Sequence, residues 1–189
     1  MSDIDDYLGS ACSAVASLNP KVVKKAAELC IDTVRNGGTI FFCGNGGSAA
    51  DSQHFAGELV GRFRMERRAL PAVALTSNSA IVTAIANDYD FTMVFARQVE
   101  ALGGPGDLLV AISTSGNSEN VLKAVEKAKE LDMRTLGLTG ESGGALCVLA
   151  DICVKASSSE TCHVQEALLV AGHAICQAVE SACARDDGV

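Results

Sequence analysis

Four polar residues on one predicted helix could do chemistry together. They are spaced by three, four and four residues and therefore share one helix face: Asp51, His54, Glu58 and Arg62. A histidine and a glutamate four residues apart can both reach one metal ion. The same spacing is typical of a solvated face with a Glu58–Arg62 ion pair, worth only ~0.3–0.5 kcal/mol. Spacing alone favours the solvated face.

A glycine-rich segment leads into this helix. Residues 44–49 read GNGGSA, which includes Asn45, Gly46 and Gly47 and matches the loose dinucleotide fingerprint G-x-G-x-x-G/A. That fingerprint also needs an acidic residue after the second strand, which here ends in LTSNS. A P-loop is excluded because no Gly-Lys-Ser/Thr follows. The segment is therefore either an anion site or a turn whose glycines permit positive φ.

A second loop is rich in hydroxyl groups. Residues 111–120 read AISTSGNSEN and offer Ser113, Thr114, Ser115 and Ser118 ahead of a predicted helix. The N-terminus of a helix supplies free N–H groups and partial positive charge, so added hydroxyls make a phosphate site that needs no Lys or Arg. An ordinary N-cap would need one hydroxyl. Four in six residues favour a site for a phosphate monoester.

The last predicted helix carries Gln165 and His173. They lie eight residues apart, which places them ~80° apart around the helix axis and ~12 Å apart along it. Both could bind one metal only if their side chains stretched toward each other, or if they came from different chains. Within the apolar segment LLVAGHAI, His173 is equally typical of a packed core histidine.

Strands alternate with helices after two N-terminal helices that are split near Pro20. We expect strands at 39–43, 71–75, 107–113, 133–139 and 151–156, and helices at 48–62, 79–86, 91–102, 118–131 and 164–184. This alternation predicts an α/β fold: a doubly wound, five-stranded parallel sheet with helices on both faces. Ligands bind such sheets beyond the carboxyl ends of the strands. We expect a single domain over residues 1–189, with 1–36 as a helical lead-in and 37–189 as the sandwich.

Composition narrows the class of protein. With 15 basic and 23 acidic residues, the formal net charge is −8, which argues against nucleic-acid binding. The chain begins with acidic residues, unlike a signal peptide, and no apolar run approaches the ~18 residues of a membrane span. The eight cysteines form no C-x-x-C pair. We expect them to be thiols in a reducing cytoplasm, with neither nucleic acid nor membrane as a partner.

Four segments together resemble a known family. They occur in the same order over nearly the whole chain, and they are CGNGGSAADSQHFAGEL, AIANDYDF, AISTSGNSENV and VQEALLVAGH. They resemble the phosphoheptose isomerases of the sugar-isomerase (SIS) domain superfamily. The resemblance implies a flavodoxin-like fold and a homotetramer with active sites between subunits. It also implies isomerisation of sedoheptulose 7-phosphate to D-glycero-D-manno-heptose 7-phosphate, the first step toward ADP-heptose and lipopolysaccharide core, and one divalent metal per subunit, usually zinc.

The resemblance also implies roles for individual residues. The metal ligands would be His54, Glu58, Gln165 and His173. The substrate contacts would be Asn45, Gly46, Gly47, Glu58, Asn87, Asp88, Ser113, Thr114, Ser115, Ser118 and Gln165. An aldose–ketose isomerase needs a base, an acid and stabilisation of an enediolate, and we expect Glu58 as the base and His173 as its acid–base partner. The chain departs from the family at His163, where Arg is common, and at Leu168, where His is frequent; both affect substrate positioning.

Three other functions compete with this interpretation. A related branch of the superfamily is a non-enzymatic regulator that binds the replication initiator protein, but that branch replaces the helix glutamate and the terminal histidine, which this chain keeps as Glu58 and His173. A sugar-phosphate-sensing SIS module would bind without turnover. An NAD-dependent dehydrogenase is the least favoured, because the acid after the second strand is missing.

Overall fold

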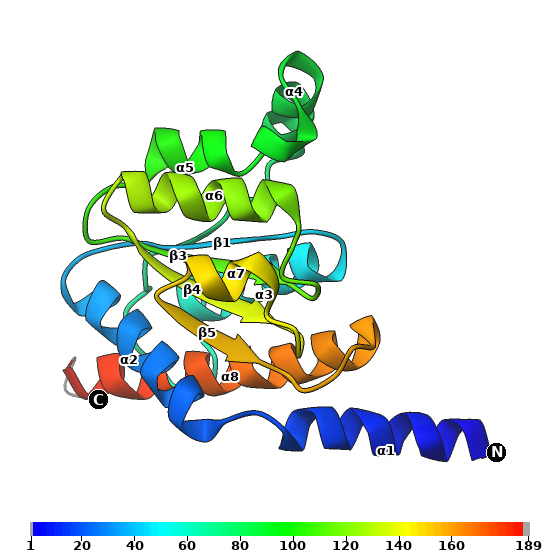
Figure 1. Cartoon of the computed structure of the whole chain (residues 1–189). Coiled ribbons are helices and arrows are strands. Elements are labelled where there is room, and N and C mark those ends of the chain that lie inside the picture. Colours follow the sequence, from blue (N-terminus) through cyan, green and yellow to red (C-terminus); the bar gives the residue numbers. More distant parts are fainter. Residues whose placement is uncertain (1, 187–189) are drawn as a thin grey trace.

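The chain folds around a five-stranded parallel sheet. The computed structural model describes residues 2–186, and the strand order is β2-β1-β3-β4-β5 (Figure 1). The strands are β1 (Ile40–Gly44), β2 (Ala72–Ala74), β3 (Leu108–Ser113), β4 (Arg134–Thr139) and β5 (Ile152–Lys155). All adjacent pairs are parallel, and the order reverses between β1 and β3. This is the flavodoxin-like topology, so the predicted fold class is confirmed and the switch point lies between β1 and β3.

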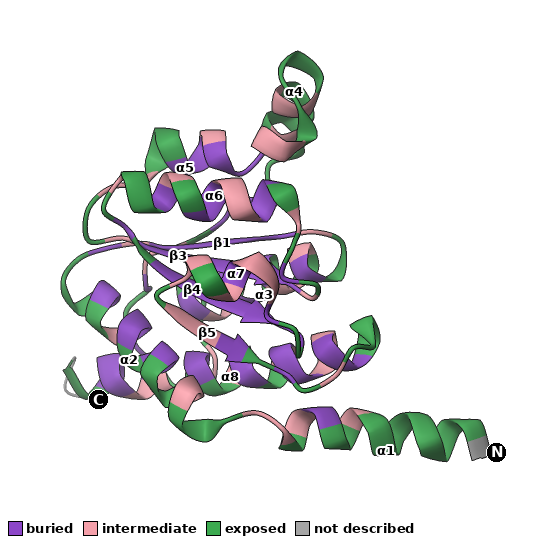
Figure 2. Ribbon diagram, in the orientation of Figure 1, coloured by how far each residue is buried: buried purple, intermediate pink, exposed green. Residues whose placement is uncertain are grey.

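Helices cover both faces of the sheet because its strands are apolar on both sides. Along β1, Ile40 and Phe42 face one core cluster, whereas Phe41 and Cys43 face the other. The first cluster packs against α2 (Pro20–Arg35), α3 (Gly47–Val60) and α8 (Thr161–Asp186). The second packs against α5 (Ala96–Leu102) and α6 (Glu119–Glu130). Figure 2 shows the buried strands between these two helical layers.

Two helices extend away from this body. The first helix, α1 (Ser2–Ala16), is mostly exposed and contacts α8. The helix α4 (Ser79–Asp88) has no buried residue and projects beyond the sheet, followed by the short 3₁₀ helix η1 (Phe91–Met93) (Figure 1). The predicted helix at 91–102 is therefore two elements, η1 and α5.

One short helix was not predicted. The helix α7 (Gly144–Leu149) lies between β4 and β5, and it buries Leu146 in the second core cluster. It brings Cys147 next to Cys153 of β5, and the two form a disulfide with a Cα–Cα distance of 5.2 Å. The expectation that all cysteines are thiols is therefore wrong for this pair. Burial raises the pKa of the Cys43 thiol to about 12, which keeps that group protonated.

The long helix α8 also differs from expectation. Among the described residues it is the one helix that is long and apolar enough to cross a membrane by length and composition, although no such segment was predicted. Of its most apolar window, 61% is buried inside the fold. Its buried face packs on α2, α3 and the sheet, which is typical of a core helix.

Candidate active site

The two predicted loops leave from neighbouring strand ends. Gly44 of β1 pairs with Ile112 of β3, so residues 45–47 and 113–118 start side by side at the switch point. The first loop is joined directly to α6, because the side-chain amides of Asn45 and Asn120 exchange two hydrogen bonds of 2.8 Å each. This pairing fixes the first loop against the start of α6.

The local geometry favours glycine at two positions of the first loop. Gly46 has a φ of 57°, in the left-handed region that favours glycine. Gly47 lies against α8, where an added Cβ would come within 2.5 Å of Gln165 Nε2. Gln165 therefore rests directly on the loop backbone, and any larger residue at 47 would displace it.

The second loop presents hydroxyls at the start of α6. Ser113 Oγ lies 3.0 Å from Ser118 Oγ, and Ser115 Oγ accepts a hydrogen bond from Asn117 N–H. Ser118 occupies the N-cap position, but its side chain makes no capping hydrogen bond within residues 2–186. The first N–H groups of α6 are thus not taken by this side chain and can serve an anion.

The two loops and α8 line an open cavity of about 230 Å³. Seven of the predicted substrate residues line it: Asn45, Gly46, Gly47, Ser113, Thr114, Ser118 and Gln165. Sequence reasoning missed Ser48 and Thr161, which also line it, while Ser115 hydrogen-bonds within its own loop. No charged side chain of the described residues lines the cavity. A phosphate here would be held by hydroxyls and amides.

A cluster of three chemically active side chains lies behind the first loop. His54 Nε2 of α3 lies 2.7 Å from His173 Nε2 of α8 and 3.6 Å from Glu58 Oε1. One ligand atom from each of the three residues lies within 4.8 Å of the others. Glu58 therefore faces His54, and Arg62 pairs with Glu66 at 3.7 Å. The interpretation of this helix face as a solvated Glu58–Arg62 pair, which spacing favoured, is wrong.

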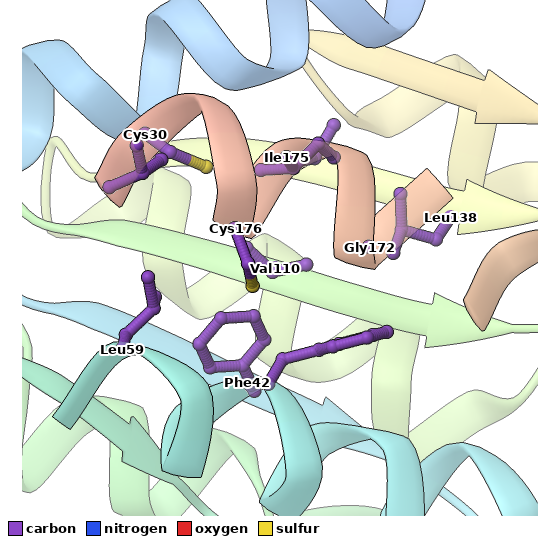
Figure 3. Close-up of a pocket in the computed structure, with 11 residues that line it drawn as sticks. Cys30, Phe42, Leu59, Val110, Leu138, Gly172, Ile175 and Cys176 are labelled. Atoms are coloured by element: carbon purple, nitrogen blue, oxygen red, sulfur yellow. The ribbon is translucent and has the colours of Figure 1, made fainter. Parts of the chain in front are cut away.

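The cluster is built by close packing of α3 on α8. The Phe55 ring lies so close to Gly172 that a Cβ there would approach Phe55 Cζ to 2.1 Å. Phe55 directly follows His54, and Gly172 directly precedes His173. Beneath the contact lies a small apolar space, in which Gly172, Ile175 and Cys176 of α8 lie over Val110 of β3 (Figure 3).

Asp51 links the cluster to the cavity. It lines a shallow hollow together with Gly47 and Gln165, on the side of α3 that carries His54. Burial raises the pKa of the Asp51 carboxyl, and the nearby charges of His54 and His173 oppose that shift. The shared helix face that groups Asp51 with His54 in the sequence is thus present in the structure.

Gln165, the fourth predicted metal ligand, lies nearer the start of α8 than His173. It lies about two turns before His173 on α8, ~12 Å along the axis, and its amide contacts the loop at Gly47. In the described chain the donor atoms of His54, Glu58 and His173 lie within 4.8 Å of one another, and the role of Gln165 as a ligand stays a prediction.

The predicted residues Asn87 and Asp88 lie elsewhere. They are exposed at the end of α4, where Asn87 Nδ2 donates to Asp88 Oδ1 at 2.8 Å, and neither lines the cavity. Their contact with substrate stays a prediction.

The two departures from the family pattern have structural roles in this chain. His163 is buried, and its Nδ1 lies 2.9 Å from Glu166 Oε2. The other oxygen of Glu166 accepts a 2.6 Å hydrogen bond from Tyr7 of α1. Leu168 is fully buried in the first core cluster. Position 163 therefore anchors α1 on α8, and position 168 fills the core.

The donor set of the cluster is suited to a divalent cation. Two imidazole nitrogens and one carboxylate oxygen are ligands that zinc prefers, at ~2.0–2.2 Å from the ion. Because the three donor atoms already lie within 4.8 Å of one another, small side-chain rotations would place them around one ion. Three protein ligands would leave a position open to substrate, which is typical of a catalytic site.

Comparison with known proteins agrees with this geometry. Residues 6–140 match the family model of the SIS domain. The phosphoheptose isomerase of Akkermansia muciniphila is 49% identical over 158 residues, 84% of each chain. The structure of phosphoheptose isomerase from Neisseria gonorrhoeae has a TM-score of 0.89 at 41% identity and covers 95% of this chain and 98% of that one. The enzyme structure from Francisella tularensis has a TM-score of 0.91 at 40% identity, with 95% and 97% covered.

These relatives give no support to the alternative of a regulator that binds the replication initiator, since each is named an isomerase. The cavity at the switch point and the cluster behind it occupy the place where this fold binds ligands. The chain belongs to the SIS domain family and, within it, to the phosphoheptose isomerases.

Proposed function

We propose that this chain isomerises sedoheptulose 7-phosphate to D-glycero-D-manno-heptose 7-phosphate, the first step toward ADP-heptose and lipopolysaccharide core. One observation carries the proposal. His54, Glu58 and His173 converge from α3 and α8, the two helices whose N-terminal ends line a cavity of hydroxyls and amides, in a chain that is about half identical to phosphoheptose isomerases. The cavity suits a phosphate, and the cluster suits proton transfer.

The substrate is held at its phosphate end. Ser113, Thr114 and Ser118 donate hydroxyl hydrogens to the phosphate, and the first N–H groups of α6 add partial positive charge. The sugar chain then runs along the backbone of Gly46 and Gly47 toward the cluster. This direction places the carbons farthest from the phosphate nearest to Glu58.

The reaction moves one proton between two neighbouring carbons. Glu58 takes the proton from C1 of the ketose, which forms the enediol, and returns it to C2 of the aldose. His173 takes the proton of the C1 hydroxyl as that oxygen becomes a carbonyl, and it supplies a proton to the C2 oxygen. The protons therefore balance within one turnover, and no redox partner is needed.

The same cluster would hold the metal. His54, Glu58 and His173 would be its ligands, with Gln165 as a fourth if its side chain turns toward them or comes from a neighbouring subunit. A bound zinc ion supplies Lewis acidity that stabilises negative charge on the substrate oxygens.

Assembly would complete the site. We infer a cytoplasmic homotetramer with active sites between subunits, in which Asn87 and Asp88 of one subunit reach the substrate of another. Two features support the assembly: the projection of α4 from its own subunit, and the exposed apolar side chains of Ile81, Tyr89 and Phe91 on the same segment.

A coupled assay with sedoheptulose 7-phosphate tests the activity. The purified protein should form the aldose phosphate, lose turnover with a chelator, and regain it with added zinc. No turnover under either condition would rule out the enzyme. Binding of the sugar phosphate without turnover would instead indicate a sensing module, and co-purification with the replication initiator would indicate the regulator.

A further inference from the structure

A buried carboxylate on α8 lies outside the mechanism described above. Glu180 is only 1% exposed. Its two oxygens accept hydrogen bonds from three successive backbone N–H groups, those of Phe63, Arg64 and Met65, at 2.8, 2.7 and 2.9 Å. A buried carboxylate is costly unless its oxygens are satisfied, and these three donors satisfy them. One side chain thus fixes the loop that follows α3.

Arg67 connects the same carboxylate to the catalytic helix. Its fully buried side chain lies with Nε 3.6 Å from Glu180 Oε1. Its Nη2 donates to the backbone carbonyl of Glu58 at 2.8 Å, and its Nη1 donates to the carbonyl of Gly61 at 2.9 Å. These carbonyls belong to the last turn of α3 and its cap, which lack helical partners. Arg67 therefore holds the turn that carries Glu58 through its two Nη groups, while its Nε makes no hydrogen bond among the described residues and is matched with Glu180 in charge only.

Phe63 connects the carboxylate to the other side of the cluster. Its N–H donates to Glu180, and its ring lies over His173 with centroids 5.4 Å apart and an interplanar angle of 32°. Glu180 itself follows His173 by seven residues, two turns along the same helix face. Glu180 therefore connects to Glu58 through Arg67 and to His173 through Phe63.

We propose that Glu180 is a positioning residue for the cluster of His54, Glu58 and His173. It acts through Arg67 on the end of α3 and through Phe63 on the ring of His173, and it does not touch substrate. This role deepens the proposed function and rests on it only for its effect on turnover. Without the carboxylate, the loop loses its three N–H contacts, Phe63 leaves the His173 ring, and the turn at Glu58 loosens.

The test uses Glu180→Gln in the full-length protein. Glutamine keeps the shape but offers one acceptor oxygen instead of two, so it cannot receive all three N–H groups. The matched control is Asp186→Asn on the same helix, because Asp186 forms an exposed pair with Arg35 far along α8. The first readout needs no activity: the chain has three histidines, so their ring signals can be followed by NMR and assigned with His173→Gln.

The expected results distinguish a positioning role of Glu180 from a role in folding stability alone. Glu180→Gln should shift the ring signal of His173 in the metal-free protein, and Asp186→Asn should not. Zinc affinity should fall ~10–100-fold, the range for residues that orient metal ligands. In the assay kcat should fall while KM stays nearly constant, because residues 113–118 are untouched. An unchanged His173 signal and unchanged zinc affinity would overturn the proposal, even if the melting temperature fell.

Glu180→Gln could fail to fold, because it leaves Arg67 buried without its partner. The double variant Glu180→Gln/Arg67→Gln removes both charges and serves in that case. It should fold and still displace the His173 signal; a wild-type signal in it would overturn the proposal. If the wild-type protein showed no turnover, the proposed function would fail, but the histidine spectra would still decide the role of Glu180.

Discussion

The ring of Phe55 packs directly against the backbone of Gly172. No Cβ fits between them, since a Cβ on Gly172 would lie 2.1 Å from Phe55 Cζ. Because His54 precedes Phe55 and His173 follows Gly172, this contact sets how closely the two histidines approach. Their Nε2 atoms meet at 2.7 Å although 119 residues separate them in the chain.

Gly172→Ala should therefore damage the cluster and the core together. Overpacking of this kind costs ~1–3 kcal/mol of unfolding free energy. Zinc affinity should fall as α3 and α8 move apart, and both quantities can be measured on the purified variant by denaturation and calorimetry. The double variant Gly172→Ala/Phe55→Leu removes most of the clash and should recover part of both. A single variant with wild-type zinc affinity would contradict this explanation of the histidine contact.

Ser118→Ala should weaken substrate binding more than turnover. A hydrogen bond to a charged group is worth ~1.5–3 kcal/mol, so KM for the sugar phosphate should rise ~10–100-fold. The cluster is unchanged, so kcat should stay within a few-fold of wild type. Ser13→Ala is the control, because that hydroxyl only bonds to the carbonyl of Gly9 on the exposed helix α1. Equal KM values for the two variants would show that this loop does not bind the phosphate.

Acid should weaken the contact between Tyr7 of α1 and Glu166 of α8. Hydrogen bonds from Tyr7 and then from His163 hold the pKa of Glu166 below its usual value. Because the pKa of Glu166 is lower in the folded state, its ionised carboxylate stabilises this contact fully at pH values above its unfolded-state pKa of about 4.3. The stabilisation is lost as the pH falls through the lower folded-state pKa. Glu166 is only partly buried, so the effect is small and salt-sensitive.

Tyrosine fluorescence can follow the weakening of this contact. The chain has no tryptophan and two tyrosines, so a Tyr89→Phe background leaves Tyr7 as the reporter. Its emission should change with pH below about 4.3, the reference value for a free glutamate. The same titration with Glu166→Gln added should show no such change. A transition that persists in that variant would place the titrating group elsewhere.

Much of the fold was predictable because the pattern is local. Apolar strands followed by glycine or hydroxyl loops and then by amphipathic helices indicate parallel βα units wherever they occur. The helix α7 was missed because it is six residues long and begins at Gly144 after the N-cap Gly143, and the φ values of 54° and 73° at these glycines are typical of a turn. The Cys147–Cys153 pair depends on that helix and was missed with it.

The candidate site was predictable only in part, for a related reason. The cavity loops follow from strand ends, which the sequence marks clearly. The meeting of His54 with His173 depends on packing between distant helices, and neither residue type nor spacing encodes that distance. Glu180 was missed entirely, although an acidic residue within the apolar stretch of the last helix was a signal of a buried, partnered charge.

The roles of Glu58 and His173 can be separated from metal binding. Glu58→Gln and His173→Gln should each lower kcat ~10²–10⁴-fold, the range for general acid–base groups. Both residues would also be metal ligands, so His54→Gln is the matched control that removes a ligand but no proton-transfer group.

Turnover of all three variants is then measured at saturating zinc, with metal content determined on the same samples. His54→Gln should recover much of its turnover once the metal is restored, because its proton-transfer groups remain. Glu58→Gln should stay inactive even when loaded, because an amide cannot take the C1 proton. If Glu58→Gln and His173→Gln both isomerised the substrate at wild-type rates, the assignment of base and partner would be wrong. If zinc restored turnover equally in all three variants, the cluster would bind the metal but would not transfer protons.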